Sequence, residues 1–208
     1  MKIRNVVPED RQKVFKIVEN IWGGTDYIPL VFDEWIKDRI GRFFAAVDEK
    51  GRLVGFEKLT MVTPEDAWIE GLRKDFDSGV KGVGKFLTGH ILAFLADNIN
   101  IRSVRFATYY TNIESITLFG KMGFKVLEKR DHKFLKLSKV NSIPKYKGNR
   151  ASFTNDVNAV VEFVDRSEWK KKNKNGICHS WVVKPVNREN IEKDYIGKGN
   201  LLAIVQER

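Results

Sequence analysis

Cysteine, histidine and proline are scarce in this chain, whose 208 residues include one cysteine, three histidines and five prolines. The single cysteine, Cys178, cannot form an internal disulfide, which favours a reducing compartment. The three histidines, His90, His132 and His179, lie far apart and lack the spacing of a zinc site. We therefore expect a cytoplasmic protein without disulfides and without a bound metal.

Long apolar runs are also absent. No apolar stretch reaches the roughly 18 residues that a membrane-spanning helix needs. Residues 1–5 do not resemble the start of a secretory signal peptide, because no apolar core follows the charges. Apolar residues nevertheless make up 42% of the chain, which is enough for a sizeable core. The composition predicts a folded protein that is not associated with a membrane.

Positive charge exceeds negative charge, with a formal net charge of +10. A basic chain raises the hypothesis of nucleic-acid binding. The excess is spread along the chain, however, and its one cluster, Lys170–Lys172 with Lys174, is typical of a helix C-terminus, where cations are favourable. Nucleic acid is therefore the less favoured partner, and nothing in the sequence fixes an oligomeric state.

A glycine-rich segment, residues 78–85, is the most informative stretch of the chain. It stands between a strand-like run, Trp68 to Leu72, and a helix-like run, Lys85 to Asp97. A loop of this kind directs several main-chain N–H groups at one point, where the positive end of the helix dipole adds to them. This arrangement favours a diphosphate ligand. The residues that we expect to hold it are Gly79, Val80, Lys81, Gly82, Val83, Gly84 and Lys85.

Two common phosphate-binding loops do not fit this segment. A Walker loop needs a hydroxyl residue after its lysine, and Phe86 stands there. A dinucleotide-binding loop needs the spacing G-x-G-x-x-G, whereas the glycines here are Gly79, Gly82 and Gly84. Neither a P-loop NTPase nor a dinucleotide-binding domain is therefore expected.

Two motifs in order resemble those of the GNAT superfamily of acyl-CoA-dependent N-acetyltransferases. The family loop reads Q/R-x-x-G-x-G/A, and Gly82 and Gly84 supply its two later positions. A downstream motif, N-x-x-A/S-x-x-L-Y/F-x-x-x-G-F, is matched by Asn112, Ser115, Leu118, Phe119, Gly123 and Phe124. Two positions depart from the family pattern: Gly79 replaces the first Arg or Gln, and Phe119 replaces a tyrosine that often serves as the general acid.

The resemblance implies a fold and a domain organisation. We expect a GNAT-type α/β domain at residues 1–140, with a mixed, mostly antiparallel sheet. Its strands 67–74 and 103–110 would splay apart, and a helix at 113–122 and a hairpin at 124–137 would follow. Residues 141–151 contain Pro144 and Gly148 and are interpreted as a linker. A small α+β domain would occupy residues 152–208.

The resemblance also implies a cofactor, acetyl-CoA, and roles for particular residues. The main chain of Leu72 and Lys74 would pair with the acyl-pantetheine arm, and the Leu72 N–H would hold the thioester oxygen. Asn112, Ser115 and Phe119 would lie along that arm. Asn112 also has a purely structural interpretation, because asparagine commonly caps helix N-termini.

Glu70 is the candidate general base, because a carboxyl group among apolar neighbours acquires a raised pKa. The alternative is a surface carboxylate paired with Arg73 or Arg105. Tyr109 and Tyr110 are the candidate proton donors that would replace the missing tyrosine, since one of two successive strand residues must face the cleft. A thiolate can also leave without a donor, because thiol pKa values are only about 8.5.

The sequence therefore predicts an N-acetyltransferase that moves an acetyl group from acetyl-CoA to a primary amine by direct attack in a ternary complex. The amine would belong to a small molecule, an amino acid or a peptide. The alternatives are a non-catalytic acyl-CoA sensor, motivated by Phe119, and, less favoured, a basic nucleic-acid-binding protein.

Overall fold

A computed structural model describes residues 1–97, 100–129, 151–153, 156–172, 176–179, 181–196 and 203–205. The chain divides into two compact units, Met1–Phe124 and Lys125–Arg208, and each is described by itself. The predicted linker lies outside the described residues except for Ala151, and so does most of the predicted hairpin at 124–137. No helix in these ranges is long and apolar enough to cross a membrane.

The first unit is built on a five-stranded mixed sheet in the order β1-β2-β3-β4-β5. The first four strands pair antiparallel, and β5 joins β4 in parallel. This mixed α/β sheet confirms the predicted fold class. The strands are β1 (Lys2–Asn5), β2 (Arg42–Val47), β3 (Leu53–Met61), β4 (Asp66–Lys74) and β5 (Ser103–Arg105).

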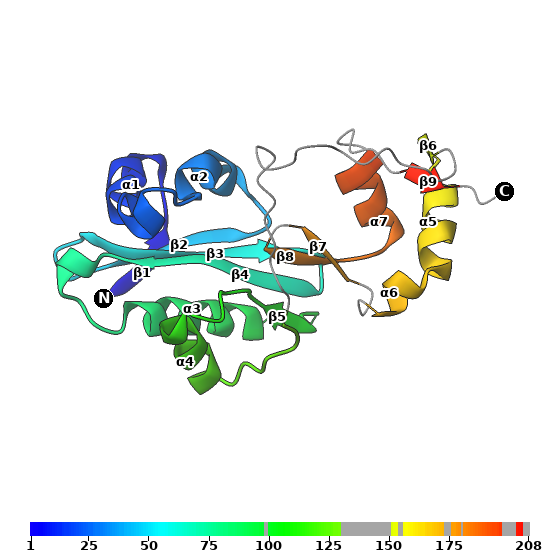
Figure 1. Ribbon diagram of the computed structural model, residues 1–208. Helices are drawn as coiled ribbons and strands as arrows, with labels where there is room; N and C mark the ends of the chain where they lie inside the picture. The colour runs from blue at the N-terminus through cyan, green and yellow to red at the C-terminus, as the bar shows by residue number, and fades with distance from the viewer. Residues whose placement is uncertain are drawn as a thin grey trace, which may run out of the picture. The chain divides into compact units, whose positions relative to one another are not determined.

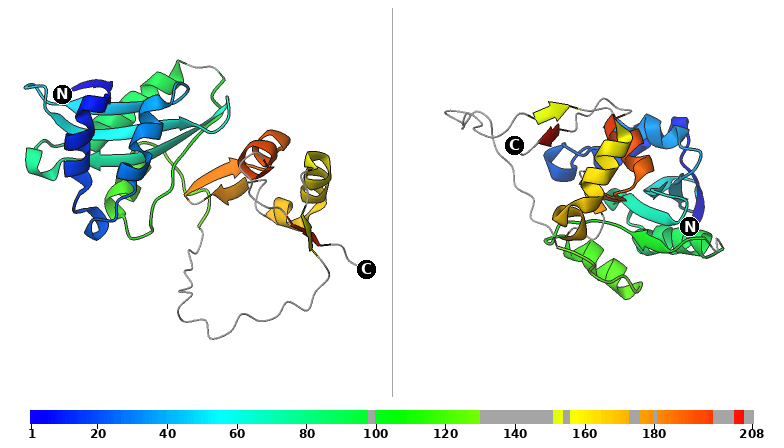
Figure 2. Two further views of the ribbon diagram at one scale, coloured as in Figure 1. Left: turned by 90° about the horizontal axis from the view of Figure 1, so that it is seen from above. Right: turned by 90° about the vertical axis from the view of Figure 1, so that its right-hand side faces the viewer.

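Helices cover both faces of this sheet (Figure 1). The first pair, α1 (Arg11–Val18) and α2 (Ile28–Lys37), lies side by side on one face, as the left view of Figure 2 shows. The other face carries α3 (Val83–Ala96) and α4 (Ile113–Lys121). Three short 3-10 turns complete the unit: η1 (Pro8–Asp10), η2 (Ile21–Gly23) and η3 (Phe76–Ser78).

Each face of the sheet has its own apolar core, because strand side chains alternate between the faces. On the α1–α2 face, the ring of Phe43 packs edge to face against the rings of Phe32, Trp35 and Phe56. The α3–α4 face buries mostly aliphatic residues, which include Val54, Leu59, Ile69, Val83, Leu87, Ile91 and Leu95. The central strands β2, β3 and β4 are therefore fixed from both sides.

A bulge interrupts β4. Phe56 pairs with Arg73 and Lys58 pairs with Glu70, so two residues, Gly71 and Leu72, oppose the single residue between Phe56 and Lys58. Gly71 adopts a positive φ of 66° there, a conformation that glycine adopts without steric cost. The extra residue keeps Glu70 and Arg73 on the same face of the sheet, toward α2.

The two strands at the far edge separate early. β5 pairs only with Asp66, Ala67 and Trp68 of β4, so β4 from Ile69 onward has no partner on that side among the described residues. The predicted strand at 103–110 is wrong in its extent, because β5 ends at Arg105 and residues 106–109 are irregular. Residues 124–129 also carry no strand, contrary to the predicted start of a hairpin.

The described residues of the second unit contain two short antiparallel strand pairs. β6 (Ala151–Phe153) pairs with β9 (Ala203–Val205), and β7 (Gly176–His179) pairs with β8 (Val182–Pro185). Its helices are α5 (Val157–Arg166), α6 (Glu168–Lys172), α7 (Arg188–Asn190) and the π-helical η5 (Ile191–Ile196). Val160, Val186 and Ile191 form its core.

One carboxyl group is completely buried in the first unit. Glu57 of β3 points toward α3, where the Thr88 hydroxyl lies 2.9 and 3.1 Å from its two carboxyl oxygens. Burial raises the pKa of Glu57 to about 8, although the Thr88 hydrogen bond acts in the opposite direction. The side chain is therefore mostly protonated at neutral pH and satisfies its hydrogen bonds as a neutral acid.

This shift predicts how stability depends on pH. The folded state holds the Glu57 proton to higher pH than the unfolded state does, so the contribution to stability is complete below pH about 4.5 and is lost as pH rises through about 8. In chemical denaturation at a series of pH values, Glu57→Gln should flatten the fall in unfolding free energy across this window. The exposed Glu49→Gln is the control and should keep the wild-type slope, and an unchanged slope in Glu57→Gln would contradict the assignment.

Candidate active site

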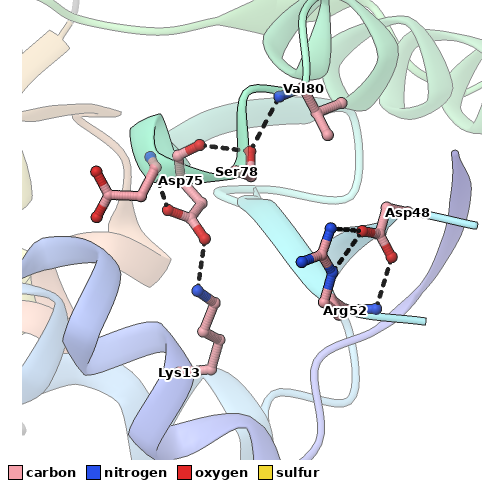
Figure 3. A network of polar contacts seen from close by, with 7 residues as sticks. Lys13, Asp48, Arg52, Asp75, Ser78 and Val80 are labelled. Atoms are coloured by element: carbon pink, nitrogen blue, oxygen red, sulfur yellow. Dashed lines mark hydrogen bonds and ion pairs between the residues drawn. The ribbon is translucent and has the colours of Figure 1, made fainter. Parts of the chain in front are cut away.

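The glycine-rich loop follows β4 and turns directly into α3. Asp75 opens it by accepting a hydrogen bond from the Asp77 amide, and its carboxylate also pairs with Lys13 of α1 (Figure 3). Gly79 and Gly82 both adopt left-handed conformations, with φ of 67° and 76°. Gly82 is the N-cap of α3, so the turn brings the first N–H groups of that helix to the end of β4.

The main-chain amides of this loop divide into two groups. The Val80 amide donates to the Ser78 hydroxyl at 3.2 Å, and that hydroxyl donates to the Asp75 carbonyl (Figure 3). The first helical bond of α3 runs from the Phe86 amide to the Gly82 carbonyl. The amides of residues 81–85 donate to no described residue, as expected for a helix N-terminus. The predicted phosphate cradle therefore needs a correction at Val80, whose amide is already occupied.

Gly84 has a packing role that the sequence did not reveal. A Cβ atom at this position would lie 3.2 Å from Leu118 and 3.3 Å from Leu72. The glycine therefore lets the first turn of α3 approach both β4 and α4 closely. By contrast, a Cβ atom at Gly79 or Gly82 would meet nothing within 4 Å, so those two glycines are required by their backbone conformation alone.

Two hollows flank the loop. One, of about 510 Å³, is lined by Met1, Gly82, Lys85, Phe86, Gly89 and His90, and so includes two residues of the predicted cradle. The other, of about 450 Å³, has a mixed lining of Lys13, Arg52, Leu53, Val54, Asp75, Asp77 and Ser78. In the second hollow, Lys13 is engaged by Asp75, and Arg52 forms an ion pair with Asp48 (Figure 3). Open space therefore adjoins the N-terminus of α3.

The downstream motif forms the start of α4. The Asn112 side-chain oxygen caps the helix by accepting from the Ser115 amide at 3.1 Å. Phe119 is only 3% exposed and stacks on Phe106 with ring centroids 3.7 Å apart, while Phe124 packs edge-on against both. The structural interpretation of Asn112 is therefore observed, and Phe119 fills the core where a family tyrosine would carry a hydroxyl.

Glu70 lies near the middle of β4, next to the bulge. The Thr60 hydroxyl donates to its carboxylate at 2.6 Å. Burial raises its pKa, and the Thr60 hydrogen bond acts against that shift. The alternative interpretation as an arginine-paired carboxylate is not observed, because Arg73 pairs with Asp26 and Arg105 faces Asp66 at 3.9 Å. Glu70 is thus a half-buried carboxylate with a single hydroxyl donor among the described residues.

The surroundings of Glu70 are charged and aromatic. Lys58 lies directly opposite on β3 and influences its pKa, as do Glu34 and Asp38 from the end of α2. Tyr27 is also close enough to interact with Glu70. The pKa of the Tyr27 hydroxyl is raised mainly by burial and then by the charge of Glu70. No local sequence pattern predicts this grouping, since its members come from three separate segments, which are α2 with its two caps, β3 and β4.

Arg73 completes this face of β4. Its Nε donates to Asp26 at 2.7 Å and its Nη1 donates to the Leu72 carbonyl at 2.9 Å, but the buried Nη2 has no hydrogen-bond partner among the residues that the structure describes. The Trp22 ring lies 4.8 Å from the guanidinium carbon. Trp22 has a left-handed backbone, with φ of 51°, which costs about 1 kcal/mol for a non-glycine residue. The α1–α2 connection thus holds a strained, exposed tryptophan over an incompletely paired arginine.

Tyr109 and Tyr110 do not lie where the sequence predicted. They follow the end of β5 rather than continuing it, and Tyr110 is 85% exposed. The prediction that a strand would direct one of them toward Glu70 is therefore wrong. Among the described residues, no group of three or more His, Cys, Asp and Glu side chains has the arrangement of a metal site.

The family model for the Acetyltransferase (GNAT) family matches residues 10–124, which is more than half of the chain. The chain therefore belongs to the GNAT family, and it is an acetyltransferase by class. The matched segment contains β4, the glycine-rich loop, α3 and the whole downstream motif, so the predicted resemblance is confirmed. A search of curated proteins gives no significant match.

Solved structures with the same fold include several acetyltransferases. A putative acetyltransferase from Agrobacterium tumefaciens is 19% identical, with a TM-score of 0.51 over 65% of this chain and 100% of that one. AAC(6')-Iy, in complex with the bisubstrate analog CoA-S-monomethyl-acetylneamine, is 18% identical, with a TM-score of 0.53 over 65% and 97%. Arabidopsis thaliana NAA60, in complex with a bisubstrate analogue, is 18% identical, with a TM-score of 0.52 over 61% and 86%. At these identities the likeness concerns the fold.

The bulge glycine gives a test of this geometry. A Cβ atom at Gly71 would lie 2.6 Å from Trp35, whereas one at Gly79 would meet nothing, although the two residues have nearly the same φ. Gly79→Ala should therefore lose about 1 kcal/mol from backbone strain alone. Gly71→Ala should lose a further 1–3 kcal/mol or so from overpacking. Urea denaturation of the two variants measures the difference, and equal losses would show that the Gly71–Trp35 contact is not as tight as described.

Proposed function

We propose that this protein is an N-acetyltransferase that uses acetyl-CoA to acetylate a primary amine. The observation that carries the proposal is the edge of β4 beyond Trp68, which has no partner strand among the described residues and leads directly into the loop amides of residues 81–85. An acyl-pantetheine arm can pair with such an edge as an added strand would. Its diphosphate then reaches the N-terminus of α3.

The cradle for the diphosphate consists of the main-chain amides from Lys81 to Lys85. These N–H groups lie at the positive end of α3, where anions are favourable. The exposed side chains of Lys81 and Lys85 add positive charge at the same place. Along the arm, the main chain of Leu72 and Lys74 offers hydrogen bonds, and Asn112 and Ser115 border it from the start of α4. The hydroxyl-free Phe119 contributes packing only.

The proposed chemistry is direct attack in a ternary complex. Glu70 accepts a proton from the ammonium, directly or through water, and the neutral amine attacks the thioester carbonyl carbon. The Leu72 N–H stabilises the oxyanion while the C–N bond forms. The C–S bond then breaks, and the second proton that the attacking nitrogen must lose passes to the departing CoA thiolate. We assign no proton donor to Tyr109 or Tyr110, because a thiol with a pKa of about 8.5 leaves readily as its anion.

The charges around Glu70 favour an amine as the acceptor. Asp26, Glu34, Asp38 and Glu70 lie around this site, where Lys58 pairs with Asp38 and Arg73 pairs with Asp26, so Glu34 and Glu70 are the carboxylates without an ion pair among these contacts. This excess of carboxylates attracts an ammonium group. Two structural neighbours were solved with bisubstrate analogues, which suits a site that holds both substrates at once.

Substitution of the base tests catalysis. Glu70→Gln keeps the shape of the side chain but removes proton acceptance, so kcat should fall about 100-fold or more while CoA affinity stays within about twofold. Thiol release from acetyl-CoA with a panel of amines measures the rate. Glu65→Gln, in the turn before β4, is the matched control and should retain the wild-type rate. No turnover by the wild type with any amine would favour the acyl-CoA sensor instead.

Calorimetric titration tests the cofactor site separately. The wild type should bind CoA but bind pantetheine, which lacks the diphosphate, far more weakly. The Lys81→Ala/Lys85→Ala double variant should lose about tenfold in CoA affinity, since each exposed cation contributes under about 1 kcal/mol. Lys50→Ala, on the β2–β3 turn, is the control. Equal binding of CoA and pantetheine would overturn the assignment of the loop to the diphosphate.

A further inference from the structure

A buried lysine lies beside the proposed base. Lys58 of β3 and Glu70 of β4 are directly paired in the sheet register. Directly opposite residues in antiparallel strands point to the same face, with Cβ atoms about 4.5–5.5 Å apart. The Lys58 side chain is only 1% exposed, and most residues of its strand are buried with it. A charge in this position requires an explanation, because lysine is almost never fully buried without a partner.

The ammonium group of Lys58 is held in a close-fitting site. It donates to the Asp38 carboxylate at 2.5 Å and to the Leu59 carbonyl at 2.7 Å. Asp38 is itself fixed by the amides of Ile40 and Gly41. A Cβ atom at Gly41 would lie 2.4 Å from both the Lys58 Nζ and the Asp38 carboxylate. The chain therefore keeps a glycine where any other side chain would displace this ion pair.

These contacts fix Lys58 without using the charge of Glu70. The nearest acceptors of Lys58 are Asp38 and Leu59, while Glu70 takes its hydrogen bond from Thr60. Lys58 therefore acts on Glu70 by Coulomb attraction between neighbouring strands and not through a direct ion pair with its carboxylate. A direct ion pair would compete with the proton transfer that the proposed mechanism needs, whereas a nearby fixed cation does not.

We propose that Lys58 is a positioning residue that keeps the Glu70 carboxylate charged and ready to accept the proton of the amine. The proposal rests on the proposed function of Glu70 as the general base. The other groups that face Glu70 are Thr60 on β3, Glu34 and Asp38 at the end of α2, and Tyr27 before α2. Lys58 is the cation among those that influence the pKa of Glu70, where it opposes the effects of burial, Glu34 and Asp38.

Two substitutions of charges that influence the pKa of Glu70 give opposite predictions. Lys58→Met removes the cation, so the pKa of Glu70 rises and the acid limb of the pH profile of kcat/KM should move up by about one pH unit. Glu34→Gln removes a like charge and leaves the Lys58–Asp38 pair intact, so the limb should move down, by about half a unit. A purely structural role for Lys58 would leave the acid limb of Lys58→Met where the wild type has it.

The experiment measures acetylation of one responsive amine from pH 5 to 9 for the wild type, both variants and Glu70→Gln. Should Lys58→Met not fold, the Lys58→Met/Asp38→Asn double variant, which leaves no unpaired buried charge, takes its place and should show a smaller upward shift. Unmoved limbs, or limbs that move in the same direction, would overturn the proposal. A wild type that acetylates no amine would instead refute the proposed function, so the two failures are distinguishable.

Discussion

The separation of β4 from β5 is the constraint on which the site depends. The two strands pair over only three residues, so β4 beyond Trp68 has no partner strand on that side in the described part of the chain. Unpaired main-chain groups at a sheet edge attract an extended ligand or chain. The loop that follows β4 leads directly into the N-terminus of α3. The strand edge that can bind an extended ligand is therefore followed at once by main-chain amides that can bind an anion.

The bulge at Gly71 and Leu72 divides the chemistry between the two faces of the sheet. Leu72 turns toward α3, where it lies against the position of Gly84, while Glu70 and Arg73 both turn toward α2. Cofactor contacts and proton transfer can therefore use neighbouring residues of one strand without competing for the same space. The same face that carries Glu70 also carries the Lys58–Asp38 pair, which places a fixed charge beside the base without a direct bond to it.

Sequence reasoning identified the parts of the structure that have local signals. The extent of β4, the loop and α3, the mixed sheet and the family all follow from glycine spacing, apolar periodicity and a thirteen-residue motif whose positions are contiguous. The incorrect and missing predictions have physical reasons. The length of β5 depends on pairing with a distant strand, so the predicted extension to Tyr110 failed. The occupied Val80 amide depends on the rotamer of Ser78, and the grouping of Lys58, Asp38 and Tyr27 with Glu70 depends on long-range packing that no local pattern encodes.

The central claim is that the amides of residues 81–85 and the free edge of β4 bind coenzyme A. Amide NMR of the full chain during a CoA titration tests it most directly, because each N–H reports on its own surroundings. The account predicts saturable shifts for residues 69–74 and 81–85, with the largest at Gly82 and Gly84 and a smaller one at Val80, whose hydrogen bond is already made. A folded protein whose loop and β4 amides stay unchanged while CoA is added in excess would contradict it.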